Sequence, residues 1–219
     1  MDAVLSCATI HQRRQTLTKM VNGSGLHDAY GATLDRIRGQ RGGSAELGMN
    51  VLMWLSHSER PLGAEELRHA LGVEVGTTDL NVHNVPSIRT LMRSTLGLAI
   101  IDKEASTIRL VHFTLQEHLS ADPSLFVTPH SMMAEVCLTY LNFQSVCDLS
   151  TPLDTIPPTL PFLRYASCYW GFHARKQMTQ DVKRLALQLL DTDAIHVSAD
   201  VLLREESAGF LPTLDRYRG

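Results

Sequence analysis

Residues 97–113, GLAIIDKEASTIRLVHF, constrain the fold of this chain more than any other stretch. Two apolar runs flank a polar turn at Asp102–Ser106, a pattern typical of a β-hairpin. In the second run, alternation places Ile108, Leu110 and His112 on one face, because successive side chains of a strand point to opposite sides. The elements that precede such a hairpin decide which fold it belongs to.

Three helical patterns precede the hairpin. The first begins at Ser44 and stops before Pro61, which cannot continue a helix, and a short extended piece follows it. The second is GAEELRHALG, residues 63–72, with glutamates in its first turn and a glycine at its end. In the third, Asn84 is the predicted N-cap and Pro86 lies in the first turn. The order helix, short strand, helix, helix and hairpin predicts a winged helix, with the hairpin as its wing.

Helical periodicity dominates the rest of the chain. Apolar residues share one helical face in three stretches after residue 130, and Ser198 is placed to cap a last helix. The proline-rich residues 150–161 indicate a linker or a long loop. We therefore expect a mainly α fold with a small β-hairpin, in which a winged helix is followed by an α-helical bundle.

The sequence divides into three predicted segments. Residues 1–43 form a helical lead-in with a break at Asn22–Gly25, residues 44–122 form the winged-helix domain, and residues 123–219 form the helical bundle domain. Basic side chains outnumber acidic ones in residues 11–41, which indicates either a solvated helical face or a contact with an acidic partner or a nucleotide.

Composition excludes several classes of function. The formal net charge of −3 gives the chain no overall attraction to nucleic acid or to an anionic membrane. The four cysteines lack the C-x-x-C pairs of a zinc site, so we expect reduced thiols and no metal. No stretch has the roughly 18 to 20 consecutive apolar residues of a membrane span, and we expect a cytoplasmic protein.

No familiar catalytic motif is present in the sequence. It lacks the G-x-x-x-x-G-K-[ST] loop that cradles nucleotide phosphates and the G-x-S-x-G elbow of α/β-hydrolases. His112 and His118 are six residues apart, whereas the H-E-x-x-H motif of metalloproteases needs a spacing of four. We therefore expect no enzymatic activity, no catalytic residues and no metal ligands.

Nucleic-acid binding is the alternative function that a winged helix raises, since its third helix can enter a major groove and its wing can touch the backbone. Arg89 and Arg93, four residues apart on the outward face of that helix, are the residues that support it. Two arginines are few, because phosphate neutralisation supplies most of the non-specific affinity for DNA. A stand-alone nucleic-acid-binding winged helix is therefore kept as the second interpretation.

The junction after the hairpin is the candidate site. Thr114 and Glu117 fit a capping box, which places a helix N-terminus two residues beyond His112. Such an end has free N–H groups and partial positive charge, which suit an anion, and an imidazole adds a donor. The alternative is a histidine that fills a strand end and bonds to a backbone carbonyl. His118, further along the helix, is predicted to be a partly buried surface histidine.

Four stretches carry a family resemblance, and they occur in the order of that family: ELGMNVLMWLSHSERPLGAEELRHALGVEVG, IRLVHFTLQEHLS, AEVCLTYLNF and PFLRYASCYWGFHAR. They resemble the region that follows the NTPase core in fungal signal-transducing (STAND) NTPases of the NACHT type, often placed before ankyrin repeats. The same region is catalogued as a winged-helix domain named after GPI inositol-deacylase. The likeness covers about residues 26–205.

The resemblance implies a role for His112. In animal NACHT receptors the winged helix carries a similar H-x-x-F-Q-E-F stretch, whose histidine reaches the β-phosphate of ADP bound to the NTPase core and holds the inactive state. His112 matches that histidine, and Gln116 and Glu117 match the following pair. Leu115 stands where those receptors have phenylalanine. An NTPase core and ankyrin repeats are not in this sequence, so the chain resembles an excised piece or a truncated product.

The implied function is that of a non-catalytic regulatory module. Such a module closes over a NACHT core, in cis or from a full-length relative, and relays its state to a C-terminal sensor such as ankyrin repeats. ADP or ATP is then a ligand of His112 only when an NTPase core is supplied, and the chain has no cofactor of its own. The name GPI inositol-deacylase implies no lipid hydrolysis here, because the lipase machinery is not in this sequence, and no membrane partner is expected.

Overall fold

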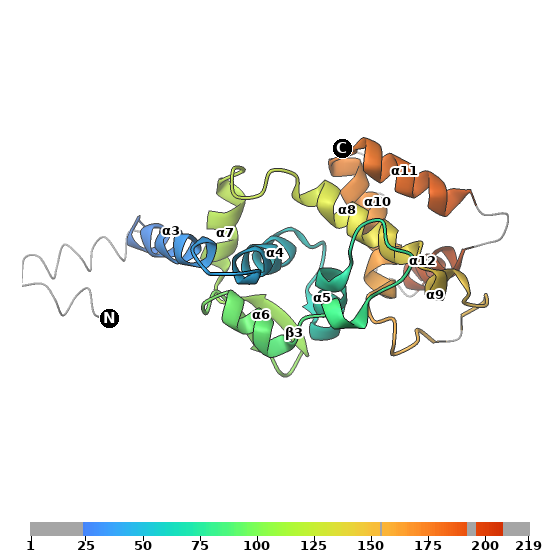
Figure 1. Ribbon diagram of the computed structural model, residues 1–219, viewed down its shortest axis with the longest axis horizontal. Helices are drawn as coiled ribbons and strands as arrows, with labels where there is room; N and C mark the ends of the chain where they lie inside the picture. Colours follow the sequence, from blue (N-terminus) through green and yellow to red (C-terminus); the bar gives the residue numbers. More distant parts are fainter. Residues whose placement is uncertain (1–23, 154, 192–195, 208–219) are drawn as a thin grey trace, which may run out of the picture.

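The computed structural model describes residues 24–153, 155–191 and 196–207. Over these residues the chain forms ten α-helices, a 3-10 helix η1 and a three-stranded antiparallel sheet (Figure 1). The mainly α fold class is therefore confirmed, and none of the described helices is both long and apolar enough to cross a membrane. The first helix predicted in the lead-in lies outside the described residues.

The elements have the following bounds, in chain order: α3 (Ser24–Arg38), α4 (Ser44–His57), β1 (Leu62–Gly63), α5 (Ala64–Gly72), η1 (Val82–Asn84), α6 (Ile88–Ser94), β2 (Ala99–Asp102), β3 (Thr107–Leu110), α7 (Phe113–Ala121), α8 (Pro129–Leu141), α9 (Gln144–Cys147), α10 (Leu163–Lys176), α11 (Gln180–Leu190) and α12 (Val197–Ser207).

The predicted winged helix is present in α4, β1, α5, α6 and the β2–β3 hairpin. The strand order is β1-β3-β2, because the extended piece after α4 pairs with the second strand of the hairpin through Leu62 and Ile108. Ile108 and Leu110 are buried while Arg109 between them is exposed, as the alternation predicts. The sheet therefore turns its apolar face toward the helices.

The start of the third helix differs from the prediction. Asn84 ends the separate turn η1, and α6 begins only at Ile88, where the Ser87 hydroxyl accepts a hydrogen bond from the Thr90 amide at 3.1 Å. Val85 is extended because Pro86 disfavours the helical conformation in the residue before it. The prediction of Asn84 as the N-cap was therefore wrong.

The lead-in helix α3 packs onto the winged helix. Its residues Tyr30, Leu34 and Ile37 belong to a buried cluster with residues of α4, β3 and α7. Where α3, α4 and the end of α6 meet, residue 48 is a glycine. A Cβ atom at Gly48 would lie 2.5 Å from the Ser94 carbonyl oxygen and 2.8 Å from the side chain of Ile37, so a glycine is needed at this crossing.

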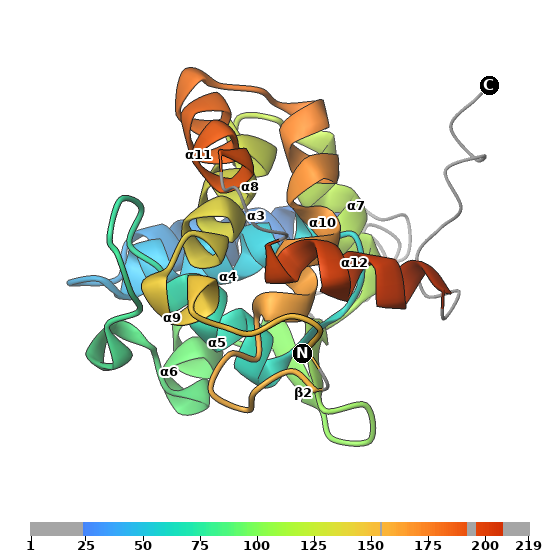
Figure 2. The same cartoon turned by 90° about the vertical axis from the view of Figure 1, so that its right-hand side faces the viewer.

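The helical bundle and the winged helix share one continuous core. In the bundle, α10 lies against both α8 and α12, and α11 packs on α8 (Figure 2). The Trp54 ring of α4 is 5.6 Å from the Phe162 ring and 5.9 Å from the Tyr165 ring. The same buried cluster extends from β1 and α5 into α8, α10 and α11. Movement of one part against the other would therefore disrupt apolar packing.

Candidate functional site

The junction between β3 and α7 places His112 at the start of a helix. His112 is extended, with φ −154° and ψ 152°, and it is the N-cap of α7. Its Nδ1 atom accepts a hydrogen bond from the Thr114 amide at 3.3 Å. One of the amides at the helix start is thereby satisfied by an imidazole, where a serine, threonine, aspartate or asparagine is more usual.

The predicted capping box of Thr114 and Glu117 is replaced by this histidine cap. Helix α7 begins at Phe113, two residues earlier than a Thr114 cap requires, so Thr114 lies inside the first turn. Its hydroxyl lies 2.9 Å from His112 Nδ1 and 2.9 Å from the Tyr30 hydroxyl, which ties α7 to α3. Glu117 is exposed on the surface of the helix.

The cap also determines which ring nitrogen of neutral His112 carries the hydrogen. An amide N–H can donate to Nδ1 only when that nitrogen is unprotonated, so neutral His112 carries its hydrogen on Nε2. Nε2 has no hydrogen-bond partner among the residues that the structure describes, and the side chain is exposed. Neutral His112 therefore has one exposed N–H donor that no described residue uses.

A cavity of about 360 Å³ opens beside His112. It is lined by the end of α4, by residues 58–62 of the following loop and strand, by β3 and by the start of α7. Arg60 on its wall is held by Glu66 through two hydrogen bonds of 2.8 and 2.6 Å. The side-chain amide of Gln116 donates to the Ser56 carbonyl. The polar side chains of Arg60 and Gln116 in the cavity wall are therefore held in place by hydrogen bonds within the chain.

Two large apolar side chains next to His112 face solvent. Val111 is 39% exposed and Phe113 is 67% exposed, and the Phe113 ring lies 4.4 Å from the His112 ring between centroids. The exposed imidazole is therefore flanked on both sides by exposed apolar side chains.

Residues 35–135 match the family described as GPI inositol-deacylase, winged helix domain. These residues are a winged-helix domain of the GPI inositol-deacylase family. The match includes the end of α3, the whole winged helix with His112, and the first half of α8. No curated protein and no solved structure matches the chain.

Within this GPI inositol-deacylase winged-helix domain, His118 has a different environment from His112. Its Nδ1 atom lies 2.8 Å from Nδ1 of His27, and its ring is 5.7 Å from the Tyr30 ring. Burial, followed by the neighbouring His27, lowers the pKa of His118. The prediction of a partly buried histidine is confirmed, and His118 fastens α7 to α3 outside the cavity.

The two arginines of the domain's third helix are exposed. Arg89 and Arg93 line a second cavity of about 400 Å³ together with Gln40 and Ser44. The turn of the wing contains Asp102, Lys103 and Glu104, and Arg109 of β3 pairs with Asp102 at 3.3 Å, so the wing has no excess of basic side chains where it would meet a phosphate backbone.

None of the cysteines in the described part of the chain has the lowered pKa of a reactive thiol. Cys137, Cys147 and Cys168 are free thiols. Burial raises the pKa of Cys137 strongly, and it raises the pKa of Cys168 to about 11. A reactive thiolate needs the opposite shift.

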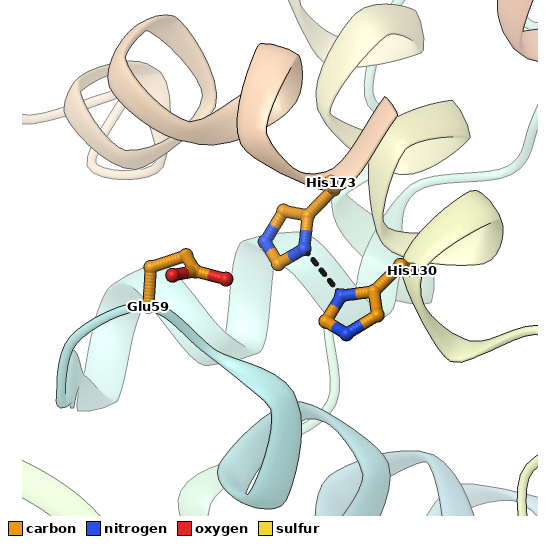
Figure 3. Close-up of side chains that lie close together, drawn as sticks. All are labelled: Glu59, His130 and His173. Atoms are coloured by element: carbon orange, nitrogen blue, oxygen red, sulfur yellow. Dashed lines mark hydrogen bonds between the residues drawn. The ribbon is translucent and has the colours of Figure 1, made fainter. Parts of the chain in front are cut away.

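A second polar cluster shares Glu59 with the cavity beside His112, and the sequence pattern did not reveal it. Glu59, His130 and His173 come together from three elements far apart in the chain (Figure 3). No short motif contains any two of them, so only the packing of α8 and α10 beside the α4–β1 loop could reveal this set.

Proposed function

We propose that this chain is a non-catalytic regulatory module of a NACHT-type NTPase. It closes over the nucleotide-binding core, supplied in cis or by a full-length relative in the cytoplasm. It relays the nucleotide state to a C-terminal sensor such as ankyrin repeats. The observation that carries this proposal is the cap that His112 Nδ1 forms at the start of α7, which leaves Nε2 as the free donor of the neutral ring.

The chemistry of this position suits a phosphate oxygen on a neighbouring surface. The N-terminus of α7 has partial positive charge, and the exposed imidazole adds a donor beside the cavity. Val111 and Phe113 supply apolar area around that donor, which a docked core would cover. Because the chain's own described residues leave Nε2 without a partner, a phosphate bound to the core would provide one.

Relay to the bundle would follow the shared core. Helix α7 contacts α3 and α4, and α4 packs on the bundle through Trp54. If the nucleotide core displaced α7, α4 and the bundle would therefore move with it. Closely packed interiors are hard to compress, so they transmit such a displacement.

The test compares two substitutions of His112 in a chain joined to a NACHT core, with release of ADP as the measurement. His112→Ala removes both the cap and the donor, whereas His112→Asn restores a favourable N-cap and removes only the imidazole. We expect both variants to release ADP faster than the parent. His83→Ala, which removes an exposed histidine of η1, is the matched control and should leave release unchanged. Unchanged ADP release in both His112 variants would exclude phosphate sensing.

A further inference from the structure

The cluster of Glu59, His130 and His173 joins the two halves of the chain. Glu59 lies in the loop between α4 and β1, His130 is the second residue of α8, and His173 is in the last turn of α10 (Figure 3). One nitrogen or oxygen atom from each side chain lies within 4.8 Å of the other two. The winged helix supplies the carboxylate and the bundle supplies both imidazoles.

The two imidazoles face each other through the same ring atom. Nδ1 of His130 lies 2.9 Å from Nδ1 of His173, so the neutral pair has one hydrogen between these nitrogens. On the other side, Nε2 of His173 lies 3.0 Å from the Tyr165 hydroxyl, which also accepts the Glu59 amide hydrogen at 3.2 Å. When Nε2 of His173 donates to Tyr165, its Nδ1 lone pair points at His130.

This arrangement has the parts of a metal site. Metal-binding histidines usually give their other ring N–H to a fixed acceptor, and Tyr165 provides that acceptor for His173. Two imidazoles and a carboxylate are a ligand set that zinc accepts, with a further position open to water. Both histidines are also kept neutral, because burial, followed by Lys176, lowers the pKa of His130 to about 4, and burial, followed by the neighbouring His130, lowers that of His173 to about 3.

We propose that Glu59, His130 and His173 bind one divalent transition metal ion of the zinc class, which fastens the winged helix to the helical bundle. Both Nδ1 atoms and a Glu59 carboxylate oxygen are the ligands, and each imidazole keeps its hydrogen on Nε2. No proton leaves the pair, because the hydrogen between the Nδ1 atoms belongs on Nε2 in the bound tautomer.

Lys176 is the group that the ion must displace. Its ammonium lies 2.6 Å from a Glu59 carboxylate oxygen, and its side chain is 45% exposed. Lys176 can therefore turn into solvent when a divalent ion takes over the carboxylate. Glu59 also lines the cavity beside His112, so occupancy by metal would fix one wall of the proposed nucleotide-sensing surface.

The experiment is a calorimetric titration of Zn²⁺ into the untagged full chain, with Cys7 and Cys147 replaced by serine so that these thiols do not bind zinc. We expect one ion per chain and a higher melting temperature with zinc than with chelator. His130→Ala and Glu59→Gln should weaken binding by at least about tenfold, and Tyr165→Phe by about 10- to 100-fold. His83→Ala is the matched histidine control and should bind like the parent.

Lys176→Met separates loss of a ligand from loss of the fold. It removes a competing charge and no ligand, so zinc should bind more tightly than in the parent, a gain that partial unfolding cannot imitate. The absence of stoichiometric binding in the parent, equal binding in His130→Ala, or weaker binding in Lys176→Met would each overturn the site. None of these outcomes depends on ADP, so they are distinct from the test of His112.

Discussion

The Trp54 ring of α4 packs edge-on against the Tyr165 ring of α10, with centroids 5.9 Å apart and an interplanar angle of 68°. This contact joins the winged helix to the helical bundle at the centre of one buried cluster. Tyr165 also contacts His173, so the apolar core and the proposed metal site meet at a single side chain.

Trp54→Ala should destabilise the whole chain. Removal of a buried tryptophan costs about 3–5 kcal/mol of unfolding free energy, through lost burial and the cavity left behind. Because the core is continuous, we expect helicity and the fluorescence of Trp170 in α10 to be lost in one coincident urea transition. Two separate transitions in the parent chain would show that the halves unfold independently.

Gly48→Ala should be destabilising by about 1–3 kcal/mol, the range for overpacking of a tight contact. The added Cβ would meet the Ser94 carbonyl oxygen at 2.5 Å, and a backbone atom cannot turn aside as the end of a side chain can. Gly171→Ala is the control, because Gly171 lies exposed in α10 with no atom within 4 Å of an added Cβ. That variant should gain about 0.5–1 kcal/mol from helix propensity, as urea denaturation would measure. Equal effects at both glycines would contradict the close crossing of α4 and α6.

The hairpin and the helix order could be predicted because alternation and helical periodicity are local properties of the sequence. Helix starts were predicted less well. At both Thr114 and Ser198 the sequence shows a good capping residue, yet the cap is the histidine two residues earlier, and the Ser198 amide donates to His196 Nδ1 at 3.1 Å. Standard capping rules omit histidine, so these two predictions were wrong.

The cluster of Glu59, His130 and His173 could not be predicted from sequence patterns, for a different reason. His130 and His173 are on separate helices, and their facing geometry arises from the packing of α8 against α10. The absence of C-x-x-C and H-E-x-x-H motifs excludes local sites only. A site assembled across a helix pair leaves no fixed spacing in the sequence.

Duplex DNA should not shift in mobility with this chain at low salt. Arg89 and Arg93 are exposed, but in the wing Asp102 and Glu104 balance Lys103 and Arg109, and the chain has a net charge of −3. Non-specific affinity comes largely from phosphate neutralisation, which this surface supplies poorly. A shift that disappears in Arg89→Glu would favour the nucleic-acid-binding alternative over the regulatory module.

Acid should destabilise the chain through the buried histidines. The pKa values of His173 and His130 are lowered from 6.5 to about 3 and about 4, in both cases chiefly by burial. Between those values and about pH 6.5 the unfolded chain binds more protons than the folded chain, so stability is full above pH 6.5 and falls as the pH decreases. For His173, whose side chain is 0% exposed, the loss between pH 6.5 and 5 is about 2 kcal/mol, at about 1.4 kcal/mol per unit.

Urea denaturation at pH 7.5 and pH 5, with chelator present to exclude metal, measures this acid sensitivity. His130→Asn should reduce it, because the variant removes one of the buried histidines that bind a proton on unfolding, and it also removes the His130 interaction that lowers the pKa of His173. His83→Asn, at an exposed position of η1, is the matched control and should retain the pH dependence of the parent. A parent chain equally stable at both pH values would show that His130 and His173 are protonated in the folded state, and their neutral Nδ1–Nδ1 contact would then be wrong.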